Sequence, residues 1–171
     1  EPSPLTEAQQ KFSDAIPFRR LGSESCALEQ SLGRVTARDI TAPEDMPAYN
    51  RAIVEGFLIH TEDGAGASEE KPVSFRIAGA VKPGDRQCPT FKRGQAVRIA
   101  TGSLVPDGPY SSVRAWEAKE DGESFTISRP FPPRFFIEEK GCDLKQGATA
   151  LPAGTRIDAA AIGTIAALGI P

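Results

Sequence analysis

The chain has 171 residues, which is enough for one ordinary domain or for two small ones that share contacts. Charged residues make up 25% and hydrophobic residues 39%, and 16 glycines with 15 prolines favour many turns and short strands over a helix bundle. A net charge of -3 and a pI near 5.3 give no electrostatic footprint for nucleic acid or an anionic membrane, so neither is expected as a partner.

Cysteine usage and hydropathy indicate the compartment. The three cysteines, Cys26, Cys88 and Cys142, lie far apart and suggest neither a disulfide framework nor a thiolate zinc site. No apolar run approaches the roughly 18 residues of a membrane span, and no signal-peptide pattern opens the chain. We therefore predict a cytoplasmic protein. Because the first residue is Glu1 rather than Met, we expect that an N-terminal portion has been removed.

The N-terminal segment predicts a short amphipathic helix. Thr6 begins a sequence of the capping-box type and is the expected N-cap. The apolar residues that follow at helical spacing are Ala8, Phe12 and Ile16. Pro17 ends the run, because proline cannot continue a helix.

Residues 43–57 combine a proline-bounded, extended approach with a polar loop and the start of a β-prone run. A carboxylate, Glu55, interrupts that run directly before Gly56. An acid that is buried without a partner costs several kcal/mol. Glu55 is therefore expected to face a cleft, a cation or solvent, and solvent is the commonest environment for this residue type.

Apolar runs and period-two alternation predict strands at residues 57–59, 73–77 and 96–100. His60 follows the first of these strands, where a lone histidine is expected to be structural or solvated. The third strand runs into Thr101, Gly102 and Ser103. This loop offers two hydroxyls and a close backbone approach to an oxyanion, although an ordinary turn explains the same residues.

Two further strands, at residues 113–118 and 124–128, are expected to form a hairpin through the Asp-Gly pair between them. Trp116 lies in the first of these strands, so we expect a half-buried strand tryptophan, with stacking on a heterocycle as the alternative. Residues 130–133 then break the sheet. The chain ends in a helix with Asp158 as N-cap. The residues expected on one face of that helix are Ile162, Ile165, Ala166 and Gly169.

Seven short motifs then carry a resemblance over nearly the whole chain. They are Leu-Gly-Arg-Val at 32–35, Pro-x-Asp-Met-Pro at 43–47, Glu-Gly-Phe at 55–57, the 96–106 run ending Thr-Gly-x-x-Val-Pro, Gly-x-Asp at 141–143, Leu-Pro-Ala-Gly-Thr-Arg at 151–156, and Ile-Gly-x-x-Ala-x-Leu-Gly-Ile at 162–170. Their order and spacing resemble those of the N-terminal half of the molybdopterin molybdenumtransferase family, which includes MoeA and the gephyrin E domain.

The resemblance implies a mainly β fold with a few helices, built of irregular, bifurcated sheets in two intertwined subdomains. The discontinuous subdomain I would comprise residues 1–41 and 135–171, and the β-rich subdomain II would be inserted at residues 42–134. The family works as a homodimer, and a molybdopterin-binding domain follows this region. The chain is therefore expected to be a fragment that contributes half of a composite cleft.

The family inserts molybdate into adenylated molybdopterin in a Mg-dependent step that hydrolyses the adenylate, so molybdopterin-AMP and molybdate are the expected substrates and Mg²⁺ the expected cofactor. A molybdopterin-adenylating protein is a candidate partner. The resemblance places the family's catalytic groups on Glu55, Thr101 and Asp143. Glu55 would also contact the metal, because hard cations prefer oxygen ligands. Gly102 and Ser103 would contact the cofactor.

Several positions depart from the family pattern. Glu55 stands where the family has aspartate, which moves the carboxylate by a methylene. Glu138 stands where the family has arginine, and either Lys140 or Arg134 could restore the lost cation. Two hypotheses follow: the N-terminal portion of a divergent molybdenum-insertion enzyme, or a catalytically eroded paralogue that serves as a dimerisation or interaction scaffold.

Overall fold

The structure, a computed structural model, describes residues 4–17 and 21–171. It is mostly β with two α-helices among these residues, which confirms the predicted fold class. The elements are α1 (Pro4–Ala15), η1 (Leu28–Gln30), β1 (Ile40–Thr41), β2 (Arg51–Ala52), β3 (Gly56–His60), η2 (Thr61–Gly64), β4 (Val73–Val81), β5 (Gln95–Ile99), β6 (Tyr110–Arg114), η3 (Ala115–Glu117), β7 (Ala118–Asp121), β8 (Ser124–Ile127), β9 (Ile137–Glu138), β10 (Thr149–Leu151) and α2 (Ala159–Ala167).

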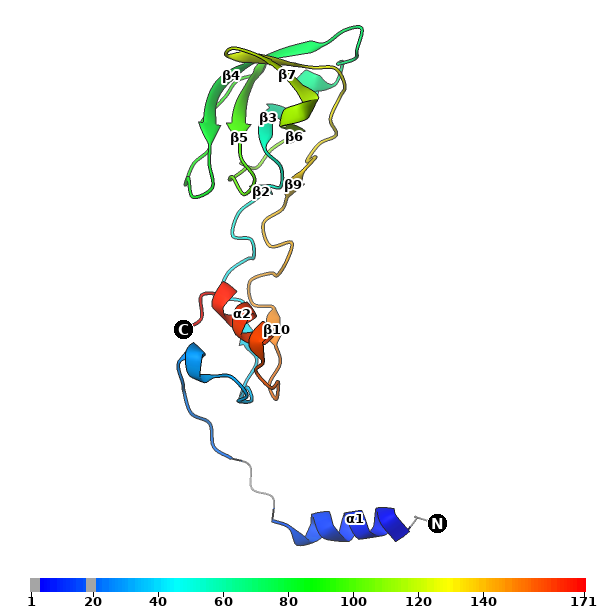
Figure 1. Cartoon of the computed structure of the whole chain (residues 1–171), viewed down its shortest axis with the longest axis vertical. Helices are drawn as coiled ribbons and strands as arrows, with labels where there is room; N and C mark the ends of the chain where they lie inside the picture. The colour runs from blue at the N-terminus through cyan, green and yellow to red at the C-terminus, as the bar shows by residue number, and fades with distance from the viewer. Residues whose placement is uncertain (1–3, 18–20) are drawn as a thin grey trace.

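Residues 28–171 form two lobes joined by a narrow neck, and α1 lies apart from both (Figure 1). We call residues 51–138 the sheet lobe, and residues 28–41 with 149–171 the small lobe. The neck consists of the two segments between them, residues 42–50 and 139–148. These names describe the shape only, and the subdomain limits expected at residues 42 and 134 stay a prediction.

A curled, six-stranded sheet makes up most of the sheet lobe, in the order β6-β3-β5-β4-β8-β7. All neighbours are antiparallel except β4 and β5, which are parallel. The strand β3, which lies between β6 and β5, is buried on both faces, as its unbroken apolar sequence requires. Alternation in β4 holds as predicted for Val73, Phe75 and Ile77, until a register shift after Ile77 turns Val81 to the opposite face.

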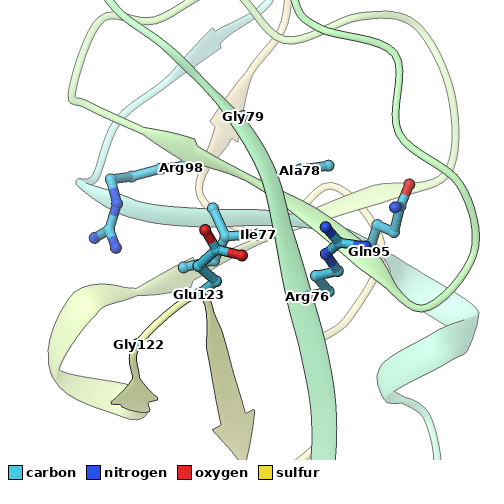
Figure 2. Close-up of a pocket in the computed structure, with 8 residues that line it drawn as sticks. All are labelled: Arg76, Ile77, Ala78, Gly79, Gln95, Arg98, Gly122 and Glu123. Atoms are coloured by element: carbon cyan, nitrogen blue, oxygen red, sulfur yellow. The ribbon is translucent and has the colours of Figure 1, made fainter.

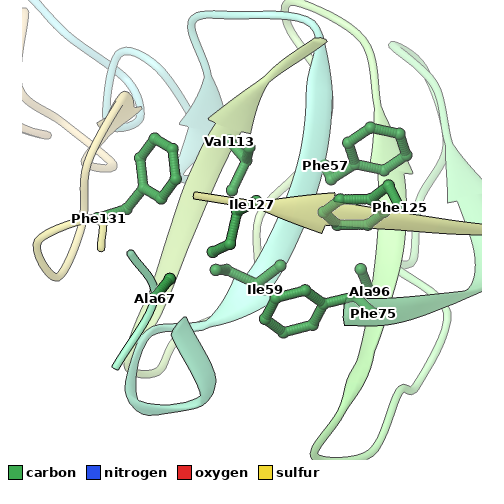
Figure 3. Packing of buried hydrophobic residues seen from close by; sticks show 9 residues of the cluster. All are labelled: Phe57, Ile59, Ala67, Phe75, Ala96, Val113, Phe125, Ile127 and Phe131. Carbon is green, nitrogen blue, oxygen red and sulfur yellow. The ribbon is translucent and has the colours of Figure 1, made fainter. Parts of the chain in front are cut away.

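Apolar side chains cover both faces of this sheet. One cluster, drawn in Figure 3, is organised around Phe57, whose ring stacks on Phe125 with centroids 3.9 Å apart. The residues of this cluster are Phe57, Ile59, Ala67, Phe75, Ala96, Val113, Phe125, Ile127 and Phe131. The other cluster contains Ala52, Leu58, Val81, Phe91, Val97, Ile99, Val105 and Ile137. His60 packs at the edge between the rings of Phe91 and Tyr110, in a structural role.

Three buried hydrophobic residues, Ile157, Ala161 and Ile165, form the packed cluster of the small lobe, and Leu168 is buried as well. Asp158 is the N-cap of α2, as predicted, and its carboxylate accepts a hydrogen bond from the Ala161 amide at 2.8 Å. The predicted helix face was right for Ile162 and Ile165, which pack against or in this core, and wrong for Ala166 and Gly169. Residues 161, 165 and 168 are buried at i, i+4 and i+7, whereas Ala166 and Gly169 are exposed.

Two other expectations about elements were wrong. Helix α1 begins at Pro4, so Thr6 lies inside the helix rather than at its N-cap, because proline suits the first helical turn. The predicted strand at 113–118 is interrupted by η3, which holds Trp116. The Trp116 side chain is 69% exposed and not half-buried in a strand.

Paired segments from distant parts of the chain form the neck. The Met46 amide donates to the Leu144 carbonyl, and the Asp143 amide donates to the Met46 carbonyl at 2.9 Å. Gly141, at φ +70°, passes so close that an added Cβ would lie 2.9 Å from Oδ1 of Asp45. The Asp45 carboxylate accepts from the Gln146 amide, and this hydrogen bond is the main cause that lowers its pKa. The two neck segments are thus joined along their length.

Candidate functional site

Glu55 lies on the surface of the sheet lobe, in the bend between β2 and β3. Its carbonyl accepts a hydrogen bond of 3.1 Å from the Ala115 amide, which ties the bend to η3. The next residue, Gly56, has φ +143°, and an added Cβ would lie 2.0 Å from the Val113 carbonyl oxygen. Only glycine fits this approach, so the position of Glu55 depends on Gly56.

The Thr101 loop packs along β2. Its Gly102 has φ +88° and donates its amide to the Ala52 carbonyl at 2.7 Å. The Gly102 carbonyl in turn accepts from the Tyr49 hydroxyl. Thr101 itself is exposed at the turn. The loop is therefore held by its backbone, and the Thr101 side chain faces solvent.

Ser103 supports this loop from inside. Its side chain is fully buried, donates to the Val81 carbonyl at 2.9 Å and accepts from the Ala100 amide at 3.0 Å. The Ser103 carbonyl also accepts from the Ala52 amide. The Ser103 hydroxyl could donate to a cofactor only by giving up its bond to Val81, and the predicted cofactor contact stays a prediction.

Asp143 lies in the neck and reaches the sheet lobe through Arg51. The Arg51 guanidinium is 3.4 Å from the Asp143 carboxylate and donates to Glu138 through its Nε at 2.6 Å. Arg51 and Glu138 face each other across the β2–β9 pair. The hydrogen bond to Glu138 is the main cause that raises the pKa of Arg51.

The pairing of Arg51 with Glu138 was not predicted from the sequence. There, Lys140 or Arg134 was expected to restore the cation that the family has in place of Glu138. Lys140 instead lies 3.6 Å from Asp45, and Arg134 lies 3.8 Å from Glu139. The cation beside Glu138 comes from β2, 87 residues away in sequence. The basic residue within the 43–57 stretch was a visible sign of a cation there, but the pairing of β2 with β9 was not predictable from the sequence.

Residues 51–55 thus bring the three predicted catalytic residues into one region. Ala52 contacts the Thr101 loop, Arg51 contacts Asp143, and Glu55 ends the bend. Within residues 4–17 and 21–171, no hydrogen bond or ion pair joins the side chains of Glu55, Thr101 and Asp143 to one another. Their backbone positions are fixed, and their polar ends remain accessible to a ligand.

The fit to Mg²⁺ is limited to one mode of binding. Among the described residues, no group of three or more His, Cys, Asp or Glu side chains could hold a metal ion. Mg²⁺ often binds through one or two carboxylates, with substrate phosphates and water as its other ligands. The exposed carboxylate of Glu55 fits that open arrangement and does not fit a preformed protein cage.

A cluster of cations and aromatic rings borders Glu55 and was not predicted from the sequence. The Glu117 carboxylate accepts two hydrogen bonds from Arg114, at 2.7 and 2.9 Å, and accepts from Arg129 as well. These arginines lower the pKa of Glu117 to about 2. The Arg114 guanidinium lies 5.0 Å from the Trp116 ring and 4.9 Å from the Phe136 ring.

Two open hollows of about 530 Å³ each lie away from this region. The first is on the sheet, and in the view of Figure 2 Arg98 and Glu123 lie on one side of β4 and Gln95 on the other. The second is in the small lobe beside Leu32 and Asp158. Neither is lined by Glu55, Thr101 or Asp143, so the candidate site is an exposed surface in this chain.

Two other features concern the helices and the cysteines. None of the helices in the described part of the chain is long and apolar enough to cross a membrane. All three cysteines are free, and Cys142 is exposed. The free thiols agree with the expectation that no disulfide framework forms.

Residues 3–169 match the family model of the MoeA N-terminal region (domain I and II). The molybdopterin molybdenumtransferase of Bacillus subtilis is 36% identical over 180 residues, which cover 98% of this chain and 40% of that protein. The protein of the same name from Staphylococcus epidermidis is 34% identical over 142 residues, covering 83% of this chain and 34% of the relative. The chain therefore spans about a third to two fifths of the length of these relatives.

Solved structures agree with the fold. A molybdopterin biosynthesis MoeA protein from Pyrococcus horikoshii OT3 superposes with a TM-score of 0.81 at 30% identity, covering 86% of this chain and 39% of that one. A second structure of a molybdopterin biosynthesis MoeA protein from Pyrococcus gives a TM-score of 0.83 at 27% identity over 99% of this chain and 43% of that one. The curled sheet and the two-lobed outline are therefore shared with these proteins.

Proposed function

We propose a function from the premise that this chain belongs to the MoeA N-terminal region family. The chain serves molybdenum cofactor biosynthesis as the N-terminal portion of a molybdopterin molybdenumtransferase, which inserts molybdate into adenylated molybdopterin. It contributes one half of a composite cleft. The observation that carries the proposal is that residues 51–55 include Glu55 and contact both the Thr101 loop and Asp143.

Each residue has a proposed task. The exposed Thr101 hydroxyl donates a hydrogen bond to an oxyanion, either molybdate or the phosphate of the substrate. Glu55 is the carboxylate of this chain that contacts Mg²⁺, which when bound neutralises charge on the phosphate. Asp143, held at 3.4 Å by Arg51, orients the other end of the substrate. A cytoplasmic location, a homodimer and a molybdopterin-adenylating partner belong to the same proposal.

The test is cofactor formation from adenylated molybdopterin and molybdate, measured by activation of a molybdenum-free apoenzyme. The enzyme is the full-length gene product that contains this chain. We expect Glu55→Gln, Thr101→Ala and Asp143→Asn each to lower the rate by about 100-fold or more, as positioned groups do. Glu69→Gln, on an exposed loop of the same lobe, is the matched control and keeps the wild-type rate.

The alternative is a catalytically eroded paralogue that acts as an interaction scaffold. It is favoured by the carboxylate of Glu138, paired with Arg51, at a position where the family resemblance expects arginine. Under this alternative the wild-type product forms no cofactor. The combined changes Glu55→Asp and Glu138→Arg, which restore the family residues, would then be needed to recover the reaction. The 171-residue chain alone is expected to form no cofactor under either hypothesis.

A further inference from the structure

Trp116 is the only tryptophan of the chain, and its side chain is 69% exposed. An indole has a large apolar surface, and exposing most of it to water forgoes the stabilisation that burial would give. Nearby strands offer buried positions to apolar residues, as Val113 shows. Trp116 therefore contributes little to the packing of the sheet lobe, and its exposed ring needs another explanation.

The exposed ring also has a cation–π contact. The Arg114 guanidinium lies between the ring of Trp116 and the ring of Phe136, at 5.0 and 4.9 Å from their centroids. Arg114 is itself fixed by the two hydrogen bonds to Glu117, which also accepts from Arg129. The Glu117 side chain is only 13% exposed. A ring that already has such a contact loses less rotamer freedom than an uncontacted ring when a ligand stacks on it.

The ring belongs to the same surface as the candidate acid. The Ala115 amide donates to the Glu55 carbonyl, and the Ile53 amide donates to the Phe136 carbonyl, each at 3.1 Å. Ile53 is 41% exposed. The bend that carries Glu55 and the turn that carries Trp116 are therefore joined through their backbones, and both residues are exposed.

We infer that Trp116 is a stacking face for a planar nitrogen heterocycle of the substrate, the pterin or the adenine ring, with Arg114 holding the indole. This inference rests on the proposed function, because adenylated molybdopterin carries both rings. Aromatic stacking on a base changes affinity by about 5- to 150-fold when the side chain is truncated to alanine. Trp116 is a binding residue, and no chemical step is assigned to it.

The test uses the single tryptophan as its own reporter. Neopterin and AMP are titrated separately into the chain, and binding is followed by Trp116 fluorescence, by neopterin anisotropy and by calorimetry for AMP. We expect saturable quenching by one of the two probes, which identifies the ring that stacks. Trp116→Ala should weaken that probe by about 10-fold or more, and Trp116→Phe should weaken it less. Leu32→Ala, which removes an apolar side chain that is 64% exposed in the small lobe, should not change binding.

Circular dichroism establishes that the variants are folded, which is expected because the Trp116 side chain is exposed. The inference is overturned if neither probe binds the wild-type chain, or if Trp116→Ala binds both probes as the wild type does. It is also overturned if Trp116→Ala changes only the oligomeric mass in sedimentation, since the ring would then belong to a protein interface.

A kinetic comparison separates this inference from the proposed function. In the full-length product, Trp116→Ala should raise the KM for adenylated molybdopterin by about 10-fold and change kcat much less. If Glu55→Gln abolishes cofactor formation while Trp116→Ala leaves KM unchanged, the proposed function stands and the stacking role fails. If the wild type forms no cofactor but a probe still binds at Trp116, the proposed function fails and the stacking role stands.

Discussion

The sheet lobe and the small lobe differ in how much apolar surface each of them buries. The sheet lobe has a cluster of nine buried residues and a second cluster of eight, on opposite faces of one sheet. The small lobe has a single cluster of three buried residues, which includes Ile165, and leaves Leu32 and Val35 mostly exposed. The sheet lobe can therefore hold the candidate site rigidly, whereas the small lobe depends more on caps and on the neck.

The largest effect should come from Gly56→Ala in the sheet lobe. The new Cβ would meet the Val113 carbonyl oxygen at 2.0 Å, and φ +143° is strained for any residue with a side chain. We expect the free energy of unfolding in urea to fall by about 4 kcal/mol or more. The matched control is Gly66→Ala, which meets no atom within 4 Å and should change the value by less than about 0.5 kcal/mol. Equal effects at the two glycines would contradict this account of the bend.

The next effect should be Ile165→Ala in the small lobe, where the side chain is 4% exposed. Loss of a buried isoleucine costs about 2–5 kcal/mol. Because the small core has few other members, we expect hydrogen exchange to accelerate in α2 while the amides of β3 and β5 keep their protection. If exchange in the two lobes accelerates together, the neck couples them into one cooperative unit. Val35→Ala, at an exposed position of the same lobe, should leave exchange unchanged.

A smaller effect is expected from acid at the Glu117 cluster of the sheet lobe. The pKa of Glu117 is about 2 in the folded chain, below its ordinary value of 4.5. Its contribution is therefore fully present above pH 4.5 and is lost as the pH falls from there towards 2. We expect about 1–3 kcal/mol, since both arginine partners contact solvent. Glu117→Gln should flatten this part of the curve of unfolding free energy against pH, and an unchanged curve would exclude the arginine pairing.

The smallest effect should be Asp158→Ala at the N-cap of α2. The lost hydrogen bond to the Ala161 amide is expected to cost about 1 kcal/mol. Thermal unfolding of the small lobe, followed by far-ultraviolet circular dichroism, would measure it. Asp158→Ser restores an N-cap acceptor and should recover most of the loss. A loss with serine as large as with alanine would assign the role of Asp158 to charge instead of capping.

Local signals in the sequence predicted the parts of the fold that depend on neighbouring residues. The strand at 57–59 follows from an unbroken apolar run, and Asp158 is a sufficient signal for the start of α2. The buried face of that helix was not predictable, because its packing partners, including Leu28 and Ile40, come from the other end of the chain. The predicted face was rotated about the helix axis relative to the buried one, and the spacing of apolar residues within the helix does not determine that rotation.

The candidate site was predictable in its residues but not in its arrangement. Glu55, Thr101 and Asp143 came from motifs, whereas the link from Arg51 to Asp143 and Glu138 needs β2 to pair with β9. Trp116 was placed in a strand because alternation continues through residues 113–118, although the chain turns into η3. Pairings of distant segments and single turns of 3-10 helix carry no periodic signal.

The neck sets an order in which the chain folds as it is synthesised. Arg51 and Glu138 are paired residues of β2 and β9, so the segment that forms the sheet lobe begins and ends at the same place in the structure. All six strands of its sheet lie between these residues, and the lobe can close as soon as Glu138 has emerged. Strand β1 must wait longer, because its partner β10 follows at residues 149–151. If the ribosome pauses between these points, the nascent chain would carry a finished sheet lobe while β1 is still unpaired.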